Sequence, residues 1–173
     1  MRFRKIVLTV DGICMSLGFS VRAESKTVEA GDATVSWNGT GVIDDLGFGE
    51  RVFTGTMTGT MFIRHPEGSG HALIHAAKID CQAVIRFSEN REEHQTALCI
   101  MTAHEGKDVA HGEMRCAGKK DDCRGDFTFT WGSGGFKRIT GSTPFVGGIN
   151  IEQKKEGRIY GYAAWPKLTY SLP

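Results

Sequence analysis

Residues 50–65 read ERVFTGTMTGTMFIRH, and the character of their side chains alternates from one position to the next. One set of alternate positions, from Phe53 to Ile63, is apolar or small, and the other set is mostly threonine. A period of two residues is that of a β-strand with one face buried and one face in water. The stretch therefore predicts a strand of a half-buried antiparallel sheet.

The same alternation recurs along the rest of the chain, and turn residues interrupt it every 10 to 20 positions. No segment has a 3.6-residue period long enough to predict a helix. Counting one or two strands before Asp45, the pattern predicts a single all-β domain: an antiparallel meander of roughly eight strands that closes into a barrel. The expected turns lie at 66–70, 89–91, 106–108, 119–120 and 132–135, and the expected last hairpin spans 142–153 and 158–170.

The first residues have the character of an export signal. Arg2, Arg4 and Lys5 precede a mainly apolar run, and small residues stand near Ala23 at the expected cleavage position. We therefore expect a signal peptide at 1–23, a mature domain at 24–173, and a secreted or periplasmic location.

The charge of the mature part is nearly balanced. Removal of residues 1–23 leaves 17 of the 21 basic residues and 19 of the 20 acidic residues, a net charge of about −2. A surface of this kind does not favour nucleic acid as a partner or a polybasic membrane contact. No run is long enough to span a bilayer as a helix, so we expect no stable membrane insertion.

The four cysteines of the mature part are expected to form disulfides, since their number is even and the chain is expected to be exported. If every hairpin is symmetric, Cys81 faces Cys99, Cys99 faces Cys116, and Cys116 faces Cys123, all in one row on the inner face. This register favours the pairs Cys81–Cys99 and Cys116–Cys123. The pairs Cys99–Cys116 and Cys81–Cys123 remain an alternative.

The inner face combines glycine, alanine and aromatic residues, and this mixture suggests a cavity for a small apolar or aromatic ligand. His75 is expected to point inward and could act in binding or in proton transfer. The leading hypothesis is a binding protein without a cofactor; the rivals are an isomerase or cyclase that uses His75 and a structural envelope protein with a filled barrel. The residues expected to line the cavity are Met57, Met61, His75, Ile79, Phe127, Phe129 and Trp131.

Two histidines and a carboxylate form the one candidate metal set. In the symmetric register, His104 faces His111, and Glu113 lies on the same face, which is the ligand composition of some metal sites. That face also carries Arg115 and threonines, so an exposed pair at a hairpin tip is the favoured interpretation, and no metal is expected.

Residues 131–141, WGSGGFKRITG, resemble the glycine-rich signature of the allene oxide cyclase and dirigent-like barrel group, and the likeness extends over about 50–148. The resemblance implies a barrel related to that group or to the calycins, of the kind found in bacterial exported proteins. It implies no catalytic residue at any numbered position.

Overall fold

A computed structural model describes residues 25–64, 73–89, 92–119, 121–150 and 157–173. The predicted signal peptide therefore lies outside the described residues. The described chain forms eight strands and two short 3₁₀ helices. The strands are β1 (Lys26–Gly47), β2 (Glu50–Arg64), β3 (Lys78–Ser88), β4 (Glu92–Ala103), β5 (Asp108–Lys119), β6 (Asp122–Ser133), β7 (Gly141–Asn150) and β8 (Arg158–Leu172), and the helices are η1 (His104–Gly106) and η2 (Gly134–Phe136).

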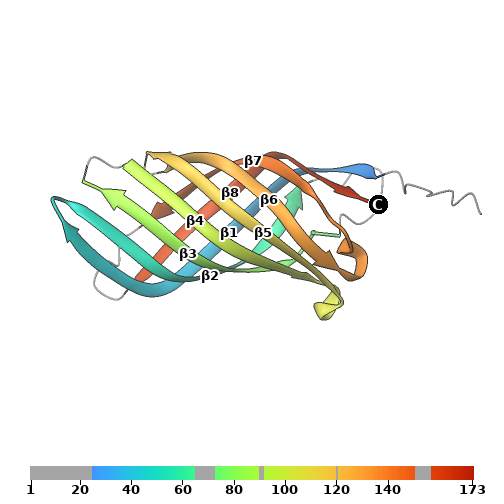
Figure 1. The fold of residues 1–173 in the computed structure, drawn as a ribbon, viewed down its shortest axis with the longest axis horizontal. Helices are drawn as coiled ribbons and strands as arrows, with labels where there is room; N and C mark the ends of the chain where they lie inside the picture. The colour runs from blue at the N-terminus through green and yellow to red at the C-terminus, as the bar shows by residue number, and fades with distance from the viewer. Residues whose placement is uncertain (1–24, 65–72, 90–91, 120, 151–156) are drawn as a thin grey trace, which may run out of the picture.

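Each strand pairs with the next in antiparallel fashion, and β1 pairs with β8, so the sheet closes into a barrel in the order β1 to β8. The all-β fold and the eight-stranded antiparallel barrel predicted from the sequence are confirmed. Figure 1 shows the long strands running obliquely to the barrel axis, with η1 and η2 at the same end of the barrel as the C-terminus. No helix in the described part of the chain is long and apolar enough to cross a membrane.

The two faces of the wall divide as the sequence predicts. Along β2, Phe53, Met57, Met61 and Ile63 are buried, whereas the threonines between them are mostly exposed. Burial of each such apolar side chain contributes about 1.5–3 kcal/mol to folding. The alternation of β2 thus supplies both a core face and a solvent face.

Glycines on the inner face receive aromatic rings from neighbouring strands. Gly161 of β8 lies opposite Trp37 of β1, and a Cβ atom on Gly161 would lie 2.1 Å from a ring carbon of that indole. A Cβ atom on Gly112 would likewise lie 2.3 Å from the ring of Phe127. The small inner residues therefore accommodate bulky neighbours, where the sequence suggested that they leave a cavity.

Both predicted disulfides are present, and all four cysteines are buried. Cys81 lies directly opposite Cys99, as the symmetric register requires. The prediction of a single row is wrong beyond this pair, since Gly112 faces Cys99 and Gly125 faces Cys116. On the other side of β3, Met57 of β2 lies opposite Cys81.

The second disulfide runs diagonally between strands. Cys116 faces Gly125 and Cys123 faces Gly118, so each cysteine stands opposite a residue without a side chain. The two Cα atoms are 5.5 Å apart, within the range that a disulfide spans. The empty glycine positions thus permit a bridge between residues that are not cross-strand partners.

Candidate functional site

Five of the seven residues predicted to line a cavity are buried inside the barrel. They are Met57, Met61, Ile79, Phe127 and Phe129. Aromatic rings contact one another there: the ring centroids of Phe127 and Phe129 are 5.1 Å apart, and those of Phe127 and Trp165 are 6.1 Å apart. These residues form a packed core.

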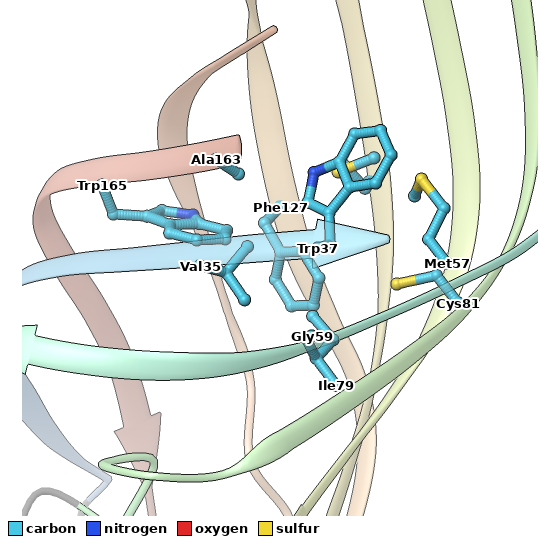
Figure 2. Close-up of a pocket in the computed structure, with 10 residues that line it drawn as sticks. Val35, Trp37, Met57, Gly59, Ile79, Cys81, Phe127, Ala163 and Trp165 are labelled. Atoms are coloured by element: carbon cyan, nitrogen blue, oxygen red, sulfur yellow. The ribbon is translucent and has the colours of Figure 1, made fainter. Parts of the chain in front are cut away.

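A small cavity lies between the described core side chains. Figure 2 shows Trp37, Phe127 and Trp165 converging on it from β1, β6 and β8, with Met57 and Cys81 beside them. Its volume is about 20 Å³, close to the space that one water molecule needs. A ligand of ordinary size would enter only if these side chains moved, so an interior site stays a prediction.

His75 does not point into the barrel, contrary to the prediction. It lies in a turn that precedes β3, its side chain is exposed, and Nδ1 accepts a hydrogen bond of 3.2 Å from the backbone N–H of Ile63. The strand alternation begins only at Lys78, and Ile74 and Ala77 are the residues of this segment that are buried. The structure therefore does not support the predicted acid–base role of His75 inside the barrel.

Trp131 also lies outside the barrel, with 54% of its surface exposed. A β-bulge causes the change: His111 pairs with Trp131 and Gly112 pairs with Phe129, so Thr130 is an additional residue on β6. An extra residue reverses the faces of the residues that follow it. Thr130 and Trp131 are consequently both exposed, and Gly132 is buried.

The three residues of the candidate metal set are not brought together. His104 lies in η1, where its ring pairs with Asp108, and Ile100 takes its expected place opposite His111. The carboxylate of Glu113 accepts a 3.1 Å hydrogen bond from Arg115. Among the residues that the structure describes, no group of three or more His, Cys, Asp or Glu side chains could hold a metal ion.

The bulge opens a groove on the outside of the barrel, at the end that carries the 3₁₀ helices. The pairing of β6 with β7 stops at Phe129 and Gly141, and the edge of β6 beyond it faces the segment 137–140. The groove has a volume of about 520 Å³, which is within the range of small-molecule sites. Its lining consists of Thr130, Trp131, Gly132, Ser133, Gly134, Lys137, Arg138, Ile139 and Thr140.

Two buried side chains fix the wall of the groove opposite β6. Phe136 and Ile139 are buried in the core, and the N–H of Ile139 donates a 2.9 Å hydrogen bond to the carbonyl of Phe136. The residues between these anchors, Lys137 and Arg138, are exposed. Packing at both ends of this short segment thus holds two cations at the groove.

Asp108 holds the start of the same wall. One carboxylate oxygen accepts a 2.7 Å hydrogen bond from the N–H of Gly135 in η2, and the other pairs with the ring of His104. The Gly135 hydrogen bond, followed by the contact with His104, lowers the pKa of Asp108 below its usual value. The ionised carboxylate of Asp108 therefore links η1 to η2.

The indole of Trp131 has a defined neighbour on one side. The ring of His111 packs against it edge to face, with centroids 4.9 Å apart and planes at 83°. This contact restricts the indole, and the exposed remainder of the ring forms part of the groove. A ring held in this way is prepared to stack against another flat surface.

The lining of the groove combines hydroxyl, aromatic and cationic side chains. Its nine lining residues, all within the described chain, include hydroxyls, an indole and two cations but no carboxylate, thiol or imidazole.

We find no match to this chain among models of known protein families or among curated proteins. The fold and the groove define the class of the protein as a closed, eight-stranded antiparallel β-barrel with a packed core and an external groove.

The sequence contained a signal for this groove that alternation alone does not reveal. Lys137 and Arg138 follow a glycine-rich bend and lie only a few residues from an aromatic residue. Alternation assigned Trp131 to the interior because a β-bulge adds a residue without leaving a pattern in the sequence.

Proposed function

We propose that this protein binds a small molecule in the groove beside Trp131 and that the packed barrel serves as a rigid scaffold for that site. The observation that carries this function is the combination of a 520 Å³ groove with an exposed indole, hydroxyl side chains and two cations. Sites on rigid elements hold their side chains in place before the ligand arrives, which reduces the entropy cost of binding.

We also propose that the protein is exported. The two disulfides are compatible with an extracellular or periplasmic protein. The signal peptide at 1–23, the relation to the allene oxide cyclase and dirigent-like group and the interior ligand remain predictions.

Native mass spectrometry of the oxidised mature protein tests the groove. The protein is incubated with a defined mixture of neutral saccharides, acidic saccharides and aromatic carboxylic acids, and retained adducts are recorded. We expect Trp131→Ala to lose the adducts. Tyr160→Ala removes an exposed aromatic residue near the N-terminal end of β8, outside the groove, and should retain the adducts. Retention of the adducts by Trp131→Ala would place the site elsewhere.

A structural protein with a filled barrel is the second candidate, and the packed core with its 20 Å³ cavity favours it. Such a protein would give no adduct with any compound in the mixture. It would also bind no small molecule through Trp131, so the same experiment separates the two functions.

A further inference from the structure

We propose that the ligand of the Trp131 groove is an acidic saccharide, that is, a sugar that carries carboxylate or sulfate groups. This inference rests on the proposed function and adds the chemical class of the ligand. It follows from the charge of the groove, from the indole and hydroxyl-bearing residues that line it, and from its open shape.

The charge of the groove selects an anion. Lys137 and Arg138 are the charged residues that line it, and neither forms an ion pair within the described part of the chain. Four other cations of the barrel surface do have carboxylate partners: Lys78, Arg115, Arg124 and Lys167. The two groove cations are therefore available to a negatively charged ligand, which is attracted by both charges.

The lining also suits a sugar ring. The exposed face of Trp131 offers a flat apolar surface on which the C–H face of a sugar can pack. Thr130, Ser133 and Thr140 also line the groove, and a hydroxyl group can donate and accept hydrogen bonds. One ring face and several hydroxyl partners match the two kinds of surface that a saccharide presents.

The open shape of the groove favours a saccharide over an apolar aromatic acid. Sites for apolar ligands enclose most of the ligand surface, whereas this groove lies along the outside of the wall beside an exposed indole. An apolar ring bound there would keep much of its surface in water. A saccharide loses less by such exposure, because its outer hydroxyls remain hydrated.

Isothermal titration calorimetry with digalacturonate tests the ligand class, with the neutral disaccharide cellobiose as the comparison. At low ionic strength we expect digalacturonate to bind about tenfold more tightly than cellobiose, since it can form two exposed ion pairs that are each weak but act together. The preference should fall as salt is added, because exposed charges are screened.

Variants identify the groups responsible. Lys137→Gln and Arg138→Gln should each weaken digalacturonate binding about three- to fivefold and leave cellobiose binding unchanged. Trp131→Ala should weaken both disaccharides by tenfold or more. Lys78→Gln removes a cation that is paired with Asp80 on β3 and should change neither affinity.

Three results would overturn the assignment of an acidic saccharide. The first is equal affinity for the two disaccharides, and the second is no detectable binding of digalacturonate. The third is tighter binding of 5′-AMP, an anion with an aromatic base, when it is titrated under the same conditions. Adducts that depend on Trp131 in the mass spectrometry experiment would still support the groove itself, so failure of the ligand class and failure of the site can be told apart.

Discussion

Gly161 lies directly opposite Trp37 on the neighbouring strand, and the indole of Trp37 occupies the space that a side chain at 161 would need. We predict that Gly161→Ala lowers the free energy of unfolding by about 1–3 kcal/mol, the usual cost of overpacking a core. Urea denaturation followed by circular dichroism measures the change.

The cause of that loss can be checked with a second substitution. Trp37→Phe removes the part of the indole nearest Gly161, so the double variant should lose less stability than the two single variants together. If Gly161→Ala proved as stable as the parent protein, the close approach of this ring would be refuted.

The disulfides should differ in their contribution to stability. The cysteines of Cys81–Cys99 are 18 residues apart, and those of Cys116–Cys123 are 7 apart. By loop-closure entropy, replacing the first pair with alanine should cost about 3 kcal/mol and replacing the second about 2 kcal/mol. A larger loss for the second pair, measured by urea denaturation, would contradict this order.

The contact between Asp108 and Gly135 should matter for both stability and binding. Asp108→Ala removes the acceptor of the Gly135 N–H, and we expect a loss of about 1–2 kcal/mol in the free energy of unfolding. It should also weaken ligand binding in the groove, because η2 begins the wall that carries Lys137 and Arg138. Asp126→Ala, on the exposed face of the same barrel, is the matched control.

The lowered pKa of Asp108 gives this contact a pH dependence. Its pKa in the folded protein lies below the usual value of 3.8, so the unfolded chain takes up a proton first as the pH falls. The stabilisation of the folded protein by ionised Asp108 is complete above about pH 4, and it is lost as the pH falls through the lower pKa of the folded state. Comparing Asp108→Asn with the parent protein by urea denaturation at pH 6 and pH 3 should show a smaller difference at pH 3; an unchanged difference would contradict the assignment.

The sequence predicted the barrel well because alternation is a local property of each strand. Residues such as Phe53 and Met61 occupy the expected face, and the preferred cysteine pairs are present. Pairing between strands was predicted less well, since it depends on where each turn is centred. His104, Glu105 and Gly106 adopt positive φ values in η1, which moves the turn before β5 toward the N-terminus and places Gly112 opposite Cys99.

The candidate site was harder to predict, because it depends on irregular backbone. The bulge at Thr130 moves Trp131 to the outer face, and the turn before Lys78 leaves His75 exposed. Each departure from strand geometry reverses the direction of a side chain that simple alternation places inside. Trp131, one of the three aromatic residues assigned to the interior, thus lines the external groove instead.

The central claim is that the ligand site is the external groove and that the core is packed. The three tryptophans report on these two places, since Trp131 lines the groove while Trp37 and Trp165 line the small internal cavity. The most direct measurement is therefore a set of ¹H–¹⁵N spectra of the three indole N–H groups during titration with the saccharides and aromatic acids described above. We predict that the Trp131 signal shifts and that the signals of Trp37 and Trp165 remain in place. Shifts of Trp37 or Trp165 with an unmoved Trp131 signal would contradict the account and locate the ligand inside the barrel.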